Sequence, residues 1–195
     1  LCLSGLAVGG AAAAAEIPAS AVVFMYHRFG ETAYPTTSVR MAQFEAHLEE
    51  IATGGYNVMP FPEIIAAFRR QESLPDRTIA LTIDDAFLSV HDRAWPLLKK
   101  SGLHFTLFVA TDAIDANRAG YMSWTQLRAL AAAGVTIGSQ TGSHPHLPDI
   151  GQTKLDEELA RSNDRFRAEL GFAPDLLAYP YGEFGMREKQ AARVA

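Results

Sequence analysis

The sequence predicts an α/β fold built from parallel strands, because two kinds of segment alternate along the 195-residue chain. Six short apolar runs, rich in β-branched residues, are separated by amphipathic stretches of near-helical period. Six strand-then-helix units in succession imply parallel strands joined by right-handed crossovers. Two architectures meet this description, a doubly wound sheet and a (β/α) barrel. No glycine-rich phosphate loop follows the first run, which weakens the nucleotide-binding version of the doubly wound sheet.

Composition narrows the classes of function. Hydrophobic residues make up 48% of the chain and charged residues 20%, which suits a chain that buries a core and excludes a disordered one. The net charge of −5 argues against a nucleic-acid partner, because such binding needs clustered Lys and Arg. Cys2 is the only cysteine, so the chain forms neither an internal disulfide nor a cysteine-based zinc site.

The strands are predicted at the apolar runs, which cover residues 21–26, 56–59, 78–83, 104–110, 135–138 and 176–179. The helices are predicted between them. Phe44, Leu48 and Ile51 recur at helical spacing, and Gly54 follows as a stop signal. Pro62 suits the first turn of the next helix. Later helices are predicted at 87–100, 124–133, 153–170 and 186–195, with Gly102, Gly134 and Gly171 after the first three.

The first fifteen residues carry no charge, and they are too short and too weakly hydrophobic for a stable membrane span. They resemble the apolar part of a secretory signal, with residues 13–15 as the cleavage site. A flexible Ala/Gly leader is the alternative. We therefore expect residues 1–20 to be a signal remnant and leader, and 21–195 to be one domain that is incomplete at its C-terminus. A signal implies a periplasmic or secreted protein, and Cys2 would be removed with it.

Ionisable or aromatic side chains follow four of the predicted strands. His27 follows the first strand, Asp84 and Asp85 the third, His144 and His146 the fifth, and Tyr181 the sixth. In a (β/α) barrel the functional residues gather at the carboxyl ends of the strands, so we expect these side chains to lie at one rim.

The adjacent carboxylates admit two interpretations. An Asp after a strand is a favoured N-cap for the next helix, which would be a purely structural role. Alternatively, one carboxylate binds a divalent cation and the other acts on a water that the cation holds. Two histidines within three residues favour the second interpretation, with His144 as a ligand and His146 as a further candidate.

These segments resemble the motifs of the polysaccharide deacetylases of carbohydrate esterase family four, the NodB-homology domain. Residues 82–86, Thr-Ile-Asp-Asp-Ala, look like the family's Thr-Phe-Asp-Asp-Gly motif. Residues 140–144, Gln-Thr-Gly-Ser-His, look like its His-Thr-x-x-His metal motif, and residues 178–182, Ala-Tyr-Pro-Tyr-Gly, look like its Arg-x-Pro-Tyr-Gly motif. Residues 25–27 and 122–124 are similar to a periplasmic branch of exopolysaccharide deacetylases. The resemblance runs from about Val22 to the C-terminus.

The resemblance implies a distorted (β/α) barrel of about seven strands, of which six βα units are present in this chain. It also implies metal-dependent hydrolysis of N-acetyl groups, and sometimes O-acetyl groups, on a hexosamine polymer. The cofactor would be a divalent metal, zinc in the first place and nickel or cobalt as alternatives. The partner would be an N-acetylated glycan. Nothing in the sequence specifies an oligomeric state.

The resemblance also assigns roles to single residues. Asp84 would be the general base and His27 the general acid, while Asp85 and His144 would bind the metal. Tyr181 would offer its backbone N–H to the oxyanion, and Tyr181 and Trp124 are candidates for substrate contact.

One position departs from the metal motif. Residue 140 is Gln where the family has its first metal histidine. Three outcomes remain open: Gln140 ligates weakly, His146 substitutes for the missing histidine, or the metal is lost. Ala178 stands where the family's Arg-x-Pro-Tyr-Gly motif has its Arg. The periplasmic branch with the Tyr-His motif, which residues 25–27 resemble, lacks this Arg as well. The alternatives to a deacetylase are therefore a catalytically silent carbohydrate-binding barrel of the same fold and an amidase acting on a small amide.

Overall fold

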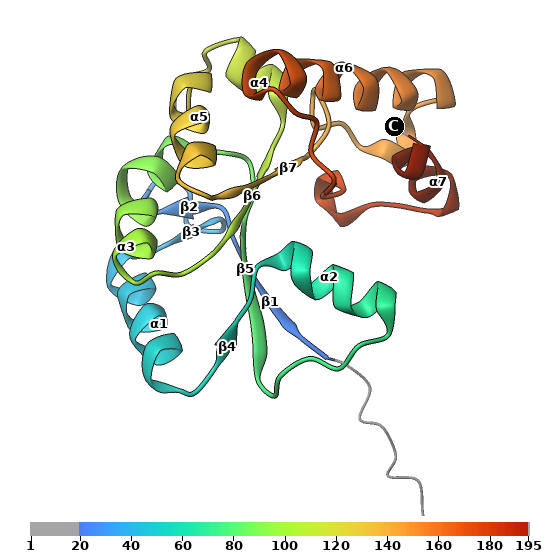
Figure 1. Ribbon diagram of the computed structural model, residues 1–195. Coiled ribbons are helices and arrows are strands. Elements are labelled where there is room, and N and C mark those ends of the chain that lie inside the picture. Colours follow the sequence, from blue (N-terminus) through green and yellow to red (C-terminus); the bar gives the residue numbers. More distant parts are fainter. Residues whose placement is uncertain (1–19, 195) are drawn as a thin grey trace, which may run out of the picture.

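The computed structural model describes residues 20–194 and has the parallel α/β fold that the sequence predicts (Figure 1). The leader expected at residues 1–20 lies, apart from Ser20, outside the described residues. The main sheet runs β1 (Val22–Tyr26), β5 (Thr78–Ile83), β6 (Thr106–Val109) and β7 (Thr136–Ser139), and β4 (Asn57–Val58) also pairs with β5. All of these pairs are parallel. A further parallel bridge joins Ser139 to Leu177.

The sheet is distorted at β5. One edge of β5 pairs with β1 along its length, from Ile79 to Ile83. The other edge is divided, because β4 pairs with its beginning at Thr78 and Ile79 and β6 with its end at Thr82 and Ile83. Two neighbours therefore share one edge of a single strand, and the sheet is splayed between β4 and β6.

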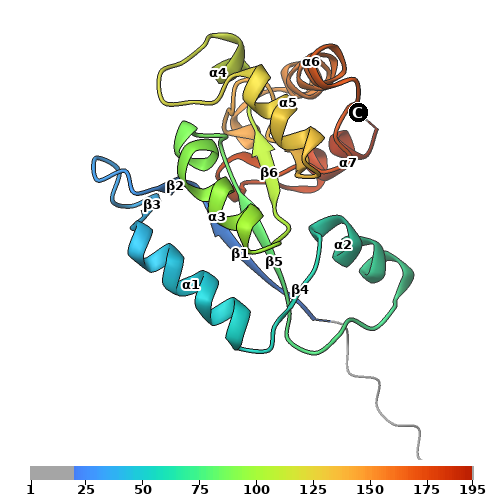
Figure 2. The same ribbon diagram turned by 60° about the vertical axis from the view of Figure 1, so that its left-hand side comes forward.

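The helices cover the two faces of this sheet. Figures 1 and 2 show α1 (Met41–Thr53), α3 (Trp95–Lys100) and α5 (Trp124–Ala132) along one face, and α2 (Phe61–Arg70) on the other. The long α6 (Gln152–Leu170) packs against α5, against the short α4 (Thr111–Asp115) and against α7 (Met186–Val194). In the part of the chain that the structure describes, no helix has both the length and the apolar character needed to cross a membrane.

The core lies between the sheet and α1, α3 and α5. Ile79, Leu81 and Ile83 alternate along β5 and join the main buried cluster with Phe44 of α1 and Leu127 of α5. Every residue of β5 is buried on both faces, as expected for the central strand of a covered parallel sheet. Side chains alternate between the two faces of a strand, so Asp84, the residue after Ile83, points away from this core toward the other face of the sheet.

The structure confirms five of the six predicted strands and reduces the sixth, at residues 176–179, to the bridge at Leu177. The helix predicted at 87–100 is observed from Leu88 onward, and a π-helical turn at Val90–Ala94 interrupts it before α3. Pro96 has no N–H for the regular helical bond, and the Trp95 N–H reaches back to the Val90 carbonyl instead. Among the described elements, β2 (Arg28–Phe29), β3 (Ser38–Val39), α4 and a 3₁₀ turn at Leu147–Asp149 were not predicted.

Candidate active site

The carboxyl ends of the parallel strands bring His27, Asp84 and Gln140 to one edge of the sheet. The Asp84 N–H donates to the Tyr26 carbonyl at 2.9 Å, so His27 lies beside Asp84 across the end of the β1–β5 pair. The Gln140 N–H donates to the Val109 carbonyl at 2.8 Å, which extends the β6–β7 ladder by one step. Asp84 and Gln140 are both buried, with 8% and 3% of their surface exposed. The backbone pairing thus places three predicted site residues together.

Gln140 connects the two carboxylate residues. Its amide oxygen accepts from the Asp85 N–H at 3.3 Å, and its amide nitrogen donates to Asp84 Oδ2 at 3.5 Å. Burial raises the pKa of Asp84 from its ordinary 3.8 to about 7, and the neighbouring Asp85 carboxylate adds to the rise. The Gln140 amide opposes the shift by favouring the charged form. A carboxyl with a pKa near neutrality is suited to taking up a proton at ordinary pH.

Asp85 and His144 face each other across the site, with 3.6 Å between Asp85 Oδ1 and His144 Nε2. Both side chains remain partly exposed, at 22% and 23%. Burial lowers the pKa of His144, although the Asp85 carboxylate pulls in the opposite direction. A lowered pKa favours the neutral imidazole, which is the form that binds a metal ion.

His146 and Tyr181 form the next layer outward. The Tyr181 ring stacks on His146 at a centroid distance of 3.9 Å and meets the edge of His144 at 4.7 Å. His146 Nδ1 lies 2.8 Å from Glu183 Oε2. The described contacts of His146 are therefore with Tyr181 and Glu183, whereas His144 is the histidine that reaches Asp85.

Unusual backbone conformations concentrate at this edge. In the described part of the chain, eight residues other than glycine have a positive φ, and five of them are Asp85, Ala86, Thr141, His144 and Tyr181. Such conformations cost on the order of 1–3 kcal/mol each and recur at functional sites, because the surrounding structure must hold them in place. The residues with positive φ thus lie just after the same strands whose ends carry the candidate side chains.

A cavity of about 340 Å³ opens beside Asp85 and His144. Its far wall includes Arg118 and Tyr121, which the segment after α4 contributes, and Ala110, Ala113 and Ala116 form an apolar side. The carboxylate and the imidazole are thus accessible from a pocket with both apolar and polar walls, as is usual for a small-molecule site.

Trp124 lies in a different setting from the other candidates. Its indole N–H donates to Asp115 Oδ1 at 2.7 Å, and its ring meets Phe166 edge-on at 5.9 Å. These contacts place it where α4, α5 and α6 meet, and no described contact joins it to Asp84, Asp85 or His144. Its role in substrate contact remains a prediction.

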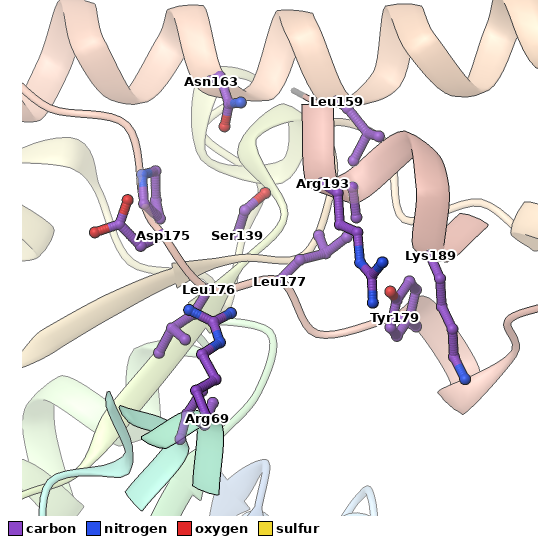
Figure 3. A pocket seen from close by; sticks show the side chains of 13 residues that line it. Arg69, Ser139, Leu159, Asn163, Asp175, Leu176, Leu177, Tyr179, Lys189 and Arg193 are labelled. Carbon is purple, nitrogen blue, oxygen red and sulfur yellow. The ribbon is translucent and has the colours of Figure 1, made fainter. Parts of the chain in front are cut away.

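A second cavity, of about 300 Å³, lies between α2, α6 and α7 (Figure 3). Arg69, Lys189 and Arg193 line it together with Asp175 and Tyr179, and none of the candidate site residues borders it. Of the candidate residues, Asp85 and His144 border the first cavity.

Sequence reasoning missed several polar residues near the site. Asp112 lines the first cavity, and Glu158 and Arg161 of α6 contact the loop before His144. Asp112 lies on a five-residue helix, which is too short to produce a periodic signal. Glu158 did leave a signal, because it falls on the buried stripe of α6 beside Leu155 and Leu159.

The metal donors available at the site are few. Among residues 20–194, no group of three or more His, Cys, Asp or Glu side chains is placed to hold a metal ion. Asp85 and His144 supply one carboxylate and one imidazole, and the Gln140 amide oxygen beside Asp85 is a neutral third donor. This set suits a divalent cation, with weaker binding than a set with two imidazoles.

Comparisons with known proteins point to one family. The family model described as "Polysaccharide deacetylase" matches residues 71–195, which is more than half of the chain. The curated protein "Putative polysaccharide deacetylase YxkH" of Bacillus subtilis is 24% identical over 177 residues. That alignment takes in 91% of this chain and 62% of the relative, so this chain spans less than two thirds of the relative's length.

Solved structures share the fold. The Streptococcus pyogenes deacetylase PplD, solved in complex with acetate, superposes with a TM-score of 0.83 at 23% identity, covering 91% of this chain and 80% of that one. IcaB from Ammonifex degensii superposes with a TM-score of 0.81 at 24% identity, covering 89% and 79%. Identities this low show a common fold, the distorted barrel expected from the motifs. On the strength of the family match, this chain belongs to the polysaccharide deacetylase family.

Proposed function

We propose that this protein is a metal-dependent deacetylase that removes N-acetyl groups from a hexosamine-containing polysaccharide or oligosaccharide, with O-acetyl groups of the same class of polymer as secondary substrates. The observation that carries the proposal is the meeting of Asp84, Asp85 and His144 at one strand edge, in a chain that belongs to the polysaccharide deacetylase family. The cavity beside them has room for an acetyl group and part of a sugar ring.

The cation would be held by Asp85 and His144, with Gln140 as a neutral third donor. Imidazole and carboxylate together suit zinc, and nickel or cobalt are the alternatives. When bound, such a cation polarises a carbonyl oxygen and lowers the pKa of a coordinated water. The neutral form favoured at His144 leaves its lone pair available for this purpose.

Three other residues would move protons or stabilise charge. Asp84 would take the proton from the attacking water, a task that its raised pKa suits. His27, beside Asp84 at the strand edge, would protonate the departing amine. The backbone N–H of Tyr181, a residue held in a left-handed turn, would donate to the developing oxyanion.

Gln140 favours a second candidate, a carbohydrate-binding barrel without catalysis. An amide binds zinc-like ions more weakly than an imidazole does, so the site could have kept its shape and lost its cation. The two functions differ in metal content and in acetate release.

The deciding experiment compares wild type with Gln140→His, His144→Ala and His104→Ala. His104 is an exposed histidine just before β6 and serves as the matched control. Metal content would be measured after equilibration with zinc, and acetate release with N-acetylglucosamine oligomers. We expect Gln140→His to bind zinc more tightly, His144→Ala to lose zinc and acetate release, and His104→Ala to behave as wild type. Full zinc content in His144→Ala would contradict the ligand assignment, and zinc-free, inactive wild type would favour the silent barrel.

We also propose that residues 21–195 form the deacetylase domain, and that the protein is periplasmic or secreted. The first statement rests on the motif resemblance, which begins at about Val22, and on the family match over residues 71–195, whereas the second rests on the apolar, uncharged residues 1–15. An extracytoplasmic location also suits a polymeric substrate. Fractionation of cells that produce the whole protein, followed by N-terminal sequencing, would test them.

A further inference from the structure

Glu158 is a fully buried carboxylate that the proposed chemistry does not use. It lies on α6 and exposes 0% of its surface. A buried carboxylate is costly unless charged or hydrogen-bonded partners surround it. Its partners are specific: Oε2 accepts from the Ser143 N–H at 2.6 Å, and Oε1 accepts from the Ser143 hydroxyl at 3.0 Å and from Arg161 Nη2 at 2.7 Å. The carboxylate is therefore directed at the residue immediately before His144.

The segment that Glu158 contacts is a loop with an unusual backbone. Thr141 has φ of 69° and His144 has φ of 59°, and neither is a glycine. The His144 N–H donates to Thr141 Oγ1 at 3.2 Å, which closes the turn on itself. Left-handed conformations at residues with a Cβ persist only where neighbouring groups hold them. The direction of the His144 side chain thus depends on what holds residues 141–144.

A closed network holds this loop from two sides. On one side, the Asp112 N–H donates to the Gly142 carbonyl at 3.0 Å. On the other side is the Glu158–Ser143 pair, and Arg161 joins the two sides by donating to Asp112 Oδ2 at 2.8 Å. The fit is close, because a Cβ on Gly142 would lie 2.5 Å from Arg161 Nη2. The loop therefore has one arrangement that satisfies Glu158, Arg161 and Asp112 together.

We propose that Glu158 is a positioning residue that sets the metal affinity of the site, by fixing through Ser143 the loop that aims His144 at Asp85. This inference rests on the proposed function, since it takes His144 to be a metal ligand. Glu158 itself does not touch the cation or the substrate. Its two bonds to Ser143 fix the peptide that precedes His144, and the His144 ring then stands with Nε2 3.6 Å from Asp85 Oδ1. Groups that orient a metal ligand typically change metal affinity by about 10- to 100-fold when removed.

The test measures Co²⁺ affinity by equilibrium dialysis for wild type, Glu158→Gln, Ser143→Ala and the double variant, with Glu157→Gln as the control. Glu157 is the exposed neighbour of Glu158 on the same helix; its described ion pair is with Lys154 at 3.4 Å, and Lys154 also lies 3.8 Å from Glu158 Oε1. We expect Glu158→Gln to weaken Co²⁺ binding by about 10-fold or more, Ser143→Ala to weaken it less, and Glu157→Gln to leave it unchanged. Because Glu158 acts through Ser143, the double variant should lose less than the product of the two single losses.

Each outcome bears on the proposal. Equal Co²⁺ affinity in wild type and Glu158→Gln, or equal losses in Glu158→Gln and Glu157→Gln, would overturn it. If Glu158→Gln does not fold, Ser143→Ala decides, because it keeps the Glu158–Arg161 pair: unchanged affinity overturns the proposal and a loss supports it. Wild type that binds Co²⁺ without releasing acetate would refute the deacetylase and leave the affinity comparison valid. Wild type that binds no Co²⁺ would overturn the positioning role itself.

Discussion

Asp84 should make the metal-free protein lose stability as the pH rises, which is the reverse of the usual behaviour of a carboxyl group. Its pKa is raised from 3.8 to about 7 by burial and by Asp85. Between these two values the folded chain holds a proton that the unfolded chain has released. The contribution of Asp84 to the free energy of unfolding therefore falls as the pH rises from about 4 to about 7, and it changes no further above that range.

The size of this effect follows from the shift. One pKa unit corresponds to about 1.4 kcal/mol, so the full displacement is worth about 4 kcal/mol, an upper bound for a group that keeps 8% of its surface exposed. Asp84→Asn removes the charge and retains the shape. We expect Asp84→Asn to gain about 2–4 kcal/mol of unfolding free energy relative to wild type at pH 8, and far less at pH 5.

The assay is urea unfolding of wild type and Asp84→Asn at several pH values between 5 and 8, in EDTA. The chelator matters, because a cation near Asp85 would favour the ionised carboxylate and shrink the effect. Asp156→Asn, an exposed carboxyl on α6, controls for loss of a charge alone. If the unfolding free energies of wild type and Asp84→Asn run parallel from pH 5 to pH 8, the burial argument for Asp84 is wrong.

Two further predictions concern packing on the face of the sheet opposite the main core. A Cβ on Gly138 would lie 2.4 Å from the ring of Phe108, so Gly138→Ala should lower the free energy of unfolding by about 1–3 kcal/mol. The control is Gly151→Ala, whose added Cβ has no heavy atom within 4 Å and should change the free energy of unfolding little. If denaturant unfolding shows equal effects for the two variants, the predicted clash with Phe108 is wrong. The buried Thr106 hydroxyl has no hydrogen-bond partner among the described residues, so Thr106→Val should raise the unfolding free energy by about 1 kcal/mol. Thr78→Val is the matched comparison and should be destabilising, since the Thr78 hydroxyl donates to the Pro75 carbonyl at 2.6 Å.

Sequence reasoning predicted the elements that are long enough to show a distinct hydrophobic pattern. β5 coincides with its predicted range because six apolar and β-branched residues in a row are typical of a strand that is covered on both faces. The two-residue β2 and β3 and the five-residue α4 are too short for a period to emerge. Residues 176–179 look like a strand in composition, yet pair only at Leu177, because pairing depends on neighbours that a local pattern does not contain.

The site, too, contains residues that the sequence indicated and residues that it did not. His27 and Asp84 were identified because each follows a predicted strand, and Gln140 because residues 140–144 resemble the family's metal motif. Parallel strands bring their carboxyl ends to one edge, which places all three together. Glu158 and Arg161 act through a loop that lies far from them in the sequence, and their contacts arise only when α6 packs beside the end of β7. Charged residues on a long amphipathic helix are usually solvated, so the only sequence signal was the position of Glu158 on the apolar stripe of α6, and nothing singled out Arg161.

The geometry also bears on the three outcomes that Gln140 leaves open. His146 stacks on Tyr181 at 3.9 Å and lies 2.8 Å from a carboxylate oxygen of Glu183; since all three side chains are about half exposed, these interactions are worth about 1–2 kcal/mol together. If His146 moved to bind a cation beside Asp85, its stacking on Tyr181 and its contact with Glu183 would both be lost. Gln140 is already there, and its contacts with Asp85 and Asp84, at 3.3 and 3.5 Å, are long and therefore weak. Recruiting the Gln140 oxygen to a cation thus costs less than recruiting His146, so a weakly bound cation with an amide donor fits this site better than a substituted histidine.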